Sequence, residues 1–362
     1  MDHFPTFPKL SEAYDERALL RERRYRRTQK GLAMTAITLG VLNVDAAYQI
    51  YEQSQNNVSV RVVSEASEPE NDNRATVVMA GFGGLDSCAS ARAIDESLGA
   101  AGETWSVRLD NQNVDTSAIA REIGEFAEER GVNEVSLYGI SFGGIYNLPI
   151  ALELVKGDYG ITSIPSAIFN DTPSSEACIK PRYTEDSRKQ EWAHRTFPLI
   201  SKSIVARTIA ELYIRKDRLW PPEKIPTTLE TTWRIVNSPN AASNQLLHNQ
   251  YNEFLSIDAE ATLRDLRHEQ RERGMTPTTW SYIGNEKDYT INTDCAVREL
   301  RLAIARTGFG QMHTTYIEGS KHGEPYLTPD LYNETLPTVL NEALAAYQYK
   351  RTAFSTPSEA LQ

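Results

Sequence analysis

Residues 134–144 read EVSLYGISFGG, a short apolar strand that runs directly into a Gly-x-Ser-x-Gly-Gly turn. An apolar helix is expected to follow this turn. The serine of such a turn points its hydroxyl away from both elements, and Gly139 and Gly143 leave room where a Cβ would collide with the neighbouring strand or helix. The start of the helix also brings unpaired N–H groups close to Ser141, which suits an attacking oxygen and the oxyanion that it creates. The stretch is therefore typical of a nucleophile elbow.

The pentapeptide alone also fits an ordinary glycine turn, so its surroundings in the sequence decide its interpretation. Residues 76–80 predict a buried strand that ends in Gly81-Phe82-Gly83-Gly84, upstream of the elbow. Two more strands run into loops downstream: residues 280–288 end at Asp288, and residues 313–323 contain His322. The chain order is therefore serine, aspartate, histidine, which is the order of the α/β-hydrolases.

On these motifs the sequence resembles the α/β-hydrolase superfamily of serine hydrolases over about residues 58–349. The resemblance implies Ser141 as the nucleophile, His322 as the general base and Asp288 as the acid that orients the histidine. His322 follows the last predicted strand, which is the position expected of the base. The resemblance implies no cofactor and no metal.

The resemblance also implies an oxyanion hole made by the backbone N–H groups of Phe82 and Phe142. Many members of the superfamily have His-Gly before the first of these donors, whereas this chain has Ala80-Gly81. The glycine of the turn is kept, so Phe82 remains the candidate for the first donor.

A second carboxylate competes with Asp288 for the role of the acid. Residues 166–171 predict a further strand of the sheet, and Asp171 stands at its end. Part of the superfamily carries the acid after this strand. The run from Gly284 to Asp288 resembles the glycine-to-acid loop of the superfamily, which favours Asp288, and Asp171 stays open as the alternative.

Strands and helices alternate along the chain, and this alternation predicts the fold class. Residues 58–63 and 105–109 predict strands, and Thr116 is expected to cap a helix that Gly131 ends. The spacing predicts an α/β fold with a mostly parallel central sheet and helices on both faces, the α/β-hydrolase fold.

We expect five segments along the chain. Helical patterns at 187–215, 241–255 and 258–273 predict an inserted helical lid over the catalytic serine. The segments are a basic and apolar N-terminal region (1–50), the first part of the hydrolase core (51–171), the helical lid (172–275), the second part of the core (276–350) and a tail (351–362).

The N-terminal region combines a basic block at 17–30 with an apolar run at 32–42. This pattern fits an export signal or a membrane anchor with a cytoplasmic N-terminus. It equally fits an amphipathic helix packed on the domain, because the run is shorter than the ~20 residues that span a bilayer. A secreted or membrane-anchored protein and a cytoplasmic protein are both compatible with it.

Length and charge exclude some functions. A chain of 362 residues with 40% hydrophobic residues can bury one large core and a subdomain. The net charge is −11, and the first fifty residues hold eight basic and six acidic side chains, so the remainder carries −13. Such an acidic body would repel the phosphates of nucleic acids, so we expect no nucleic-acid partner.

The three cysteines, Cys88, Cys178 and Cys295, lack the spacing of metal ligands and cannot all pair with one another. We expect three buried or idle thiols.

The sequence thus predicts a serine hydrolase that cleaves a carboxylic ester of a small-molecule acyl substrate through an acyl-enzyme. A thioesterase, a peptidase, a C–C bond hydrolase or an acyltransferase could use the same triad, because the fold does not fix the substrate. A non-catalytic binding protein with the hydrolase fold is the third class, and the oligomeric state stays open.

Overall fold

A computed structural model of the chain describes residues 57–110, 113–180, 244–285, 288, 290–320, 322–323 and 325–355. The predicted N-terminal region at 1–50 and the predicted lid helix at 187–215 lie outside these residues. Among the described helices, none combines the length and the apolarity that a membrane span requires.

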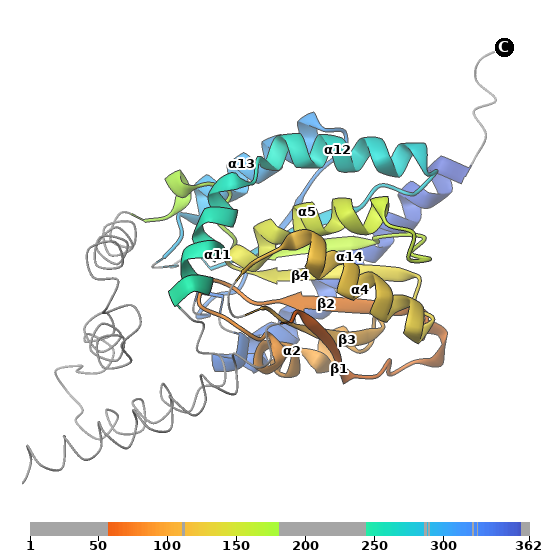
Figure 1. Ribbon diagram of the computed structural model, residues 1–362, viewed down its shortest axis with the longest axis horizontal. Helices are drawn as coiled ribbons and strands as arrows, with labels where there is room; N and C mark the ends of the chain where they lie inside the picture. The colour runs from red at the N-terminus through yellow and green to blue at the C-terminus, as the bar shows by residue number, and fades with distance from the viewer. Residues whose placement is uncertain are drawn as a thin grey trace, which may run out of the picture. The chain divides into compact units, whose positions relative to one another are not determined.

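The described strands form one seven-stranded sheet in the order β1-β3-β2-β4-β5-β6-β7 (Figure 1). β1 runs antiparallel to β3, and the other neighbouring strands are parallel. The prediction of a mostly parallel sheet is confirmed. The strands are β1 (Ser59–Ser64), β2 (Arg74–Met79), β3 (Glu103–Arg108), β4 (Glu134–Ile140), β5 (Ser166–Asn170), β6 (Thr279–Gly284) and β7 (His313–Tyr316).

The parallel strands end at a common edge of the sheet. The register pairs Met79 with Gly139 and Ile140 with Asn170, so β2, β4 and β5 finish side by side. β6 and β7 continue the same parallel arrangement. The loops that leave the C-terminal ends of these strands therefore meet at one edge, where open α/β sheets bind their ligands.

Helices cover both faces of the sheet, as predicted. Side chains of the central strands alternate between the two faces: Val77 packs into the larger core cluster and Val78 into the smaller one. The larger cluster lies under α4 (Thr116–Arg130), α5 (Phe142–Lys156), α11 (Asn244–Ser256), α12 (Ala259–Glu272) and α13 (Thr293–Arg306). The smaller one lies under α2 (Cys88–Ala93), α3 (Asp95–Leu98) and α14 (Pro329–Ser355).

The ends of two helices differ from the sequence-based prediction. The N-cap of α4 is Asp115, whose carboxylate accepts hydrogen bonds from two backbone N–H groups, so the prediction of Thr116 as the cap is wrong by one residue. Gly131 ends this helix in the left-handed conformation, as predicted. α14 continues to Ser355, past the expected start of the tail at 351.

The described part of the segment 172–275 contains helices and no strand. It contains the 3-10 helix η2 (Glu176–Cys178), α11 and α12, and Asp258 caps α12. Two other short 3-10 helices are η1 (Pro69–Asn71) and η3 (Pro325–Leu327). That the whole segment forms a lid stays our proposal, as do the segment boundaries.

Candidate active site

Ser141 lies between the end of β4 and the start of α5, in a backbone conformation that is rare for a residue with a side chain. Its φ is 51° and its ψ is −122°, and such a conformation costs about 1–3 kcal/mol. Ideal Cβ atoms on Gly139 and Gly143 would lie only 2.3 Å and 2.4 Å from neighbouring backbone. Glycines therefore permit the sharp turn, as the sequence indicated, and the turn holds Ser141 at the C-terminal edge of the sheet.

His322 bridges Ser141 and Asp288. Its Nε2 lies 3.1 Å from Ser141 Oγ, and its Nδ1 lies 2.6 Å from Asp288 Oδ2. A carboxylate accepts hydrogen bonds, so this contact assigns the ring proton to Nδ1 and leaves Nε2 to accept the proton of the serine hydroxyl. The three residues predicted from the sequence are therefore brought together in one hydrogen-bonded chain.

The Asp288 carboxylate is held on both of its oxygens. Oδ2 faces His322, while Oδ1 accepts from the N–H of Thr290 at 2.7 Å and of Ile291 at 3.0 Å. The side chain is 1% exposed and that of His322 is 14% exposed. Bonds to charged acceptors of this kind fix a carboxylate more firmly than neutral ones, so Asp288 can orient the imidazole.

Asp171, the alternative acid, lies in the same cluster but contacts other groups. One carboxylate oxygen accepts from the N–H of Asn285 at 2.9 Å, and the other accepts from the N–H of Gly323 at 2.8 Å. Asp171 thus ties the loop that carries Asp288 to the loop that carries His322. Because the oxygens of both carboxylates are occupied by N–H donors, the cluster fits a hydrogen-bonded triad better than a cation site.

Burial raises the pKa of Asp171 from its ordinary value of 3.8 to about 6, with the charge of His322 acting in the opposite direction. Because the pKa of Asp171 is higher in the folded chain, the native state binds more protons than the unfolded state between pH 3.8 and about pH 6. The free energy of unfolding therefore falls as the pH rises through this range. We expect the free energy of unfolding of the wild type, relative to that of Asp171→Asn, to fall by about 1–3 kcal/mol between about pH 4 and about pH 7. Urea unfolding of both proteins at the two pH values measures this; a difference that does not change with pH would contradict it.

The two expected oxyanion donors lie beside Ser141. Phe142 is the first residue of α5, so its N–H has no acceptor within the helix. Gly81 to Gly84 form a tight turn closed by a 3.0 Å bond from the N–H of Gly84 to the carbonyl of Gly81. An ideal Cβ on Gly81 would lie 2.8 Å from Ser141 Cβ, so this turn, with Phe82 as its second residue, packs directly on the serine.

Aromatic rings surround these donors. The ring of Phe82 is 41% exposed and its centroid lies 5.2 Å from that of Phe142, which in turn stacks on Phe254 of α11 at 4.3 Å. Phe254 lies in the segment 172–275 that the sequence predicts as the lid. Because Phe142 and Phe254 are buried, Phe82 is the ring among these three that offers an exposed apolar surface.

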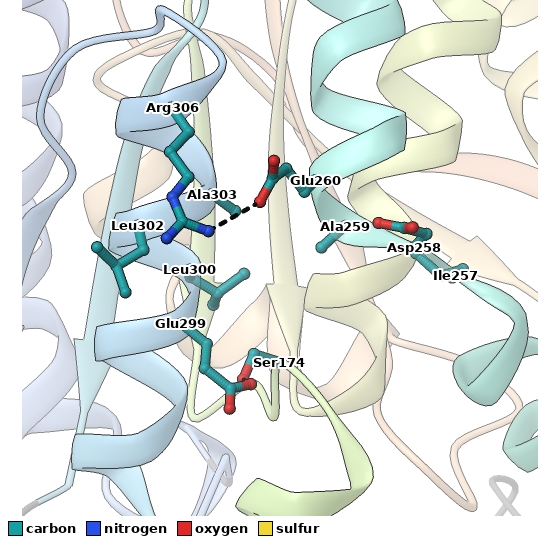
Figure 2. A pocket seen from close by; sticks show the side chains of 10 residues that line it. All are labelled: Ser174, Ile257, Asp258, Ala259, Glu260, Glu299, Leu300, Leu302, Ala303 and Arg306. Carbon is teal, nitrogen blue, oxygen red and sulfur yellow. Dashed lines mark hydrogen bonds and ion pairs between the residues drawn. The ribbon is translucent and has the colours of Figure 1, made fainter.

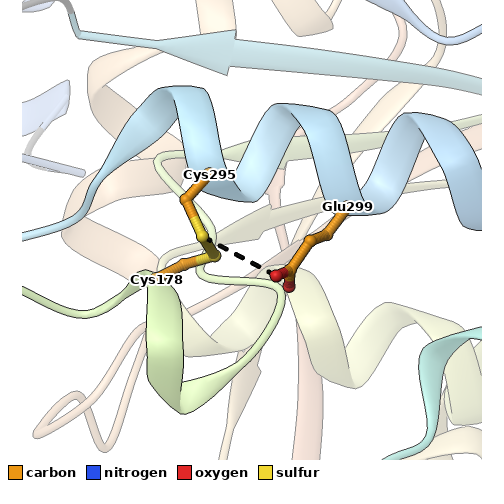
Figure 3. A group of neighbouring side chains, drawn as sticks. All are labelled: Cys178, Cys295 and Glu299. Atoms are coloured by element: carbon orange, nitrogen blue, oxygen red, sulfur yellow. Dashed lines mark hydrogen bonds between the residues drawn. A yellow bond between two sulfur atoms is a disulfide. The ribbon is translucent and has the colours of Figure 1, made fainter.

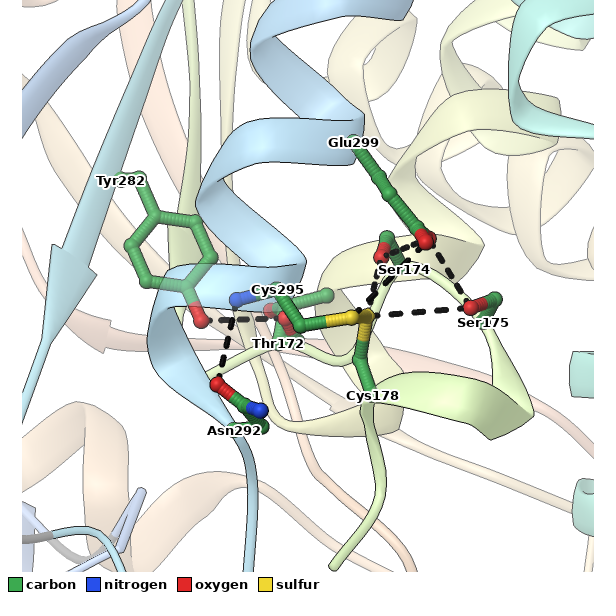
Figure 4. Close-up of a disulfide and its surroundings, with 8 residues drawn as sticks. All are labelled: Thr172, Ser174, Ser175, Cys178, Tyr282, Asn292, Cys295 and Glu299. Carbon is green, nitrogen blue, oxygen red and sulfur yellow. Dashed lines mark hydrogen bonds between the residues drawn. A yellow bond between two sulfur atoms is a disulfide. The ribbon is translucent and has the colours of Figure 1, made fainter.

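The expectation of three idle thiols is wrong, because Cys178 and Cys295 form a disulfide across 117 residues (Figure 4). Cys88 is the free cysteine. Glu299 lies beside the disulfide (Figure 3), and two sulfurs joined to each other are not available as thiolate ligands for a metal. No spacing of the cysteines in the sequence indicated this pairing.

The disulfide joins the segment after β5 to the first turn of α13, the helix that follows the loop with Asp288. Next to it, the N–H of Asn292 donates to the carbonyl of Cys178 at 2.7 Å, and the N–H of Lys180 donates to the carbonyl of Thr290 at 2.8 Å. The two segments that lie beside the acid are therefore held together covalently and by backbone bonds.

Replacing both Cys178 and Cys295 by serine is expected to lower the free energy of unfolding by about 2–5 kcal/mol, because the cross-link closes a long loop in the unfolded chain. Chemical denaturation under non-reducing conditions measures the loss. Cys88→Ser is the control and should stay within about 0.5 kcal/mol of the wild type. Equal midpoints for the double variant and the wild type would contradict the prediction.

A separate hollow of about 340 Å³ lies between α12 and α13 (Figure 2). The ion pair of Arg306 with Glu260, at 3.3 Å, crosses it. Ser141, Asp288 and His322 do not line it, so it is not the place where a substrate would meet the serine.

No protein-family model matches the sequence, and no curated protein is significantly similar to it. The fold nevertheless resembles solved structures over most of their length. A carboxylesterase of the ammonia-oxidising thaumarchaeon Nitrososphaera gargenis has a TM-score of 0.54 and 12% identity, with 80% of this chain and 97% of that chain covered. A bacterial membrane phospholipase A has a TM-score of 0.50 and 18% identity, with 89% of this chain and 99% of that chain covered.

An α/β-hydrolase enzyme from a Medee basin deep-sea metagenome library has a TM-score of 0.50 and 12% identity, with 78% of this chain and 94% of that chain covered. The shared architecture is the open, mostly parallel sheet with helices on both faces. The chain therefore has the α/β-hydrolase fold.

Proposed function

We propose that the protein is a serine hydrolase that cleaves a carboxylic ester of a small-molecule substrate through an acyl-enzyme on Ser141. The observation that carries the proposal is the hydrogen-bonded chain in which His322 lies 3.1 Å from the serine hydroxyl and 2.6 Å from the Asp288 carboxylate. The solved structures of similar fold include a carboxylesterase and a phospholipase A, both of which act on esters.

In the first half of the proposed reaction, Ser141 Oγ attacks the ester carbonyl carbon while His322 Nε2 takes the hydroxyl proton. Asp288 stabilises the imidazolium that forms. The carbonyl oxygen becomes an oxyanion and accepts hydrogen bonds from the N–H groups of Phe142 and Phe82, each worth ~3 kcal/mol in such sites. The tetrahedral intermediate then collapses, and the alcohol leaves with the proton from His322.

In the second half, a water molecule attacks the acyl-enzyme. His322 takes a proton from the water, the acyl–Oγ bond breaks, and the proton returns to Ser141 as the carboxylic acid is released. The exposed ring of Phe82, which packs on the buried ring of Phe142, favours an apolar group on the substrate near the serine.

The test combines a covalent probe with a substrate panel. A fluorophosphonate is expected to inactivate the protein with one equivalent bound, and peptide mass mapping is expected to locate the adduct on Ser141. p-Nitrophenyl esters of rising acyl length are then compared with the matching thioesters, anilides and acyl acceptors. An absence of labelling would contradict the proposal and favour a non-catalytic protein, whereas an adduct on another serine would make that serine the nucleophile in place of Ser141.

A further inference from the structure

Helix α11 contacts the turn that carries Phe82 through one fully buried side chain, Gln250. The Gln250 amide oxygen accepts from the N–H of Gly83 at 2.8 Å, and the amide nitrogen donates to the carbonyl of Gly84 at 3.1 Å. Gln250 is 167 residues from Gly83 and 166 residues from Gly84 in the sequence. Its side chain thus pairs with one N–H and one carbonyl group of the turn.

The backbone of Gln250 is tied to the other half of the site. The hydroxyl of Tyr146, which is buried in α5, donates to the carbonyl of Gln250 at 2.6 Å. α5 is the helix that begins with Phe142. Gln250 therefore connects the helix that starts behind Ser141 with the turn that lies against it.

The position of Phe82 N–H depends on these contacts. This N–H lies between Gly81, which packs on Ser141, and Gly83, whose N–H is bonded to Gln250. Gly83 has a φ of 80°, so the turn uses a conformation that is open mainly to glycine and that its neighbours have to hold in place. Without an acceptor for the N–H of Gly83, the peptide unit between Phe82 and Gly83 is held only through the bond from Gly84 to Gly81 that closes the turn. A change in its orientation would shift the adjoining peptide unit, which carries the N–H of Phe82.

We infer that Gln250 is a positioning residue for the oxyanion hole, and that it couples the geometry of Phe82 N–H to the docking of α11. This inference rests on the proposed function, because it assigns a task to Phe82 in the same reaction. A donor that is displaced by about 1 Å loses most of its contribution to the transition state while substrate binding is little affected. The role of Gln250 is therefore expected to appear in kcat rather than in KM.

The test compares Gln250→Met with Gln270→Met. Gln270 is the matched control because it is equally buried and also makes two side-chain bonds, to the hydroxyl and the N–H of Thr278, away from the turn. With a p-nitrophenyl ester, Gln250→Met is expected to lower kcat by about 10- to 100-fold with KM within about 2-fold of the wild type. The affinity for a trifluoromethyl ketone, which forms an oxyanion on the serine, should fall by the same factor. Gln270→Met should leave both values unchanged.

A second readout does not depend on activity. Hydrogen exchange at the Gly83 amide is expected to be at least about 10-fold faster in Gln250→Met than in the wild type and unchanged in Gln270→Met, since a broken bond exposes the amide. If the wild type hydrolyses no ester, the proposed function fails, and unchanged exchange would then also overturn the inference. If the wild type is active and Gln250→Met retains its kcat, only the inference is overturned.

Tyr146→Phe provides a milder variant if Gln250→Met does not fold. It keeps the ring and removes the hydroxyl that holds the Gln250 carbonyl, and it is expected to lower kcat by about 3- to 10-fold. An unchanged kcat in this variant, together with unchanged exchange at Gly83, would count against the inference.

Discussion

Replacing Ser141 by alanine is expected to lower kcat for ester hydrolysis by about 10⁶-fold, with folding intact. The variant loses the oxygen that forms the acyl-enzyme, so the only remaining route is direct attack by water on a bound ester. His322, Asp288 and the two oxyanion donors would still hold and polarise that ester, which leaves a residual rate above that of the uncatalysed reaction. Hydrolysis of a p-nitrophenyl ester by purified protein measures the loss.

Ser166→Ala is the matched control for this experiment. Ser166 is also buried, but it lies at the start of β5, at the opposite end of the sheet from Ser141, where its hydroxyl bonds to Ser136 at 3.1 Å. This variant should keep the kcat of the wild type. If Ser141→Ala kept more than about 1% of the activity, another group would be the nucleophile and the proposed mechanism would be wrong.

The part of the site that could be predicted from the sequence is the part that local rules determine. A strand, a glycine-flanked serine and a helix are neighbours in the chain, so Ser141 and the N–H of Phe142 follow from the pattern of residues 134–144 alone. His322 follows from its place after the last strand. The sheet follows from the alternation of strands and helices, since parallel strands need helical crossovers.

The choice between the two acids could not be made with the same certainty. Asp171 follows β5 and Asp288 follows β6, and these strands are parallel neighbours whose ends lie at one edge of the sheet. Both positions therefore place a carboxylate near His322, and only the orientation of the two side chains shows which of them contacts the histidine. In the structure the Asp288 carboxylate faces the ring, while that of Asp171 faces two backbone N–H groups.

The contacts that the sequence did not predict are those between distant segments. The disulfide joins cysteines that are 117 residues apart, and Gln250 reaches the turn at Gly83 from another helix. A glutamine on a helix resembles any other polar residue of a solvated face, and its burial depends on how the helix packs. Such roles become visible only when the tertiary arrangement is known.

Replacing Asp288 by asparagine is expected to lower kcat by about 10⁴-fold, the loss that this change causes in a serine-protease triad. In the wild type, one oxygen of Asp288 accepts from the backbone N–H groups of Thr290 and Ile291. In the variant these two donors would bind the amide oxygen of the asparagine, so the amide N–H₂ would face His322. The ring would then have to accept at Nδ1 and carry its proton on Nε2, the nitrogen that faces Ser141. A protonated Nε2 cannot take the serine proton. The variant should therefore keep its KM and its fold while kcat falls.

Asp171→Asn separates the two acids, because it makes the same chemical change on the neighbouring strand. The Asp171 carboxylate bonds to Asn285 and Gly323 rather than to the ring, so an asparagine there weakens one of two loop contacts and leaves the tautomer of His322 unchanged. We expect kcat to fall by no more than about 10-fold, which is the size of one lost hydrogen bond. The reverse outcome, with a large loss in Asp171→Asn and a small one in Asp288→Asn, would make Asp171 the acid. Equal large losses would mean that the two carboxylates act as one unit, in which Asp171 holds the loops in the geometry that Asp288 needs.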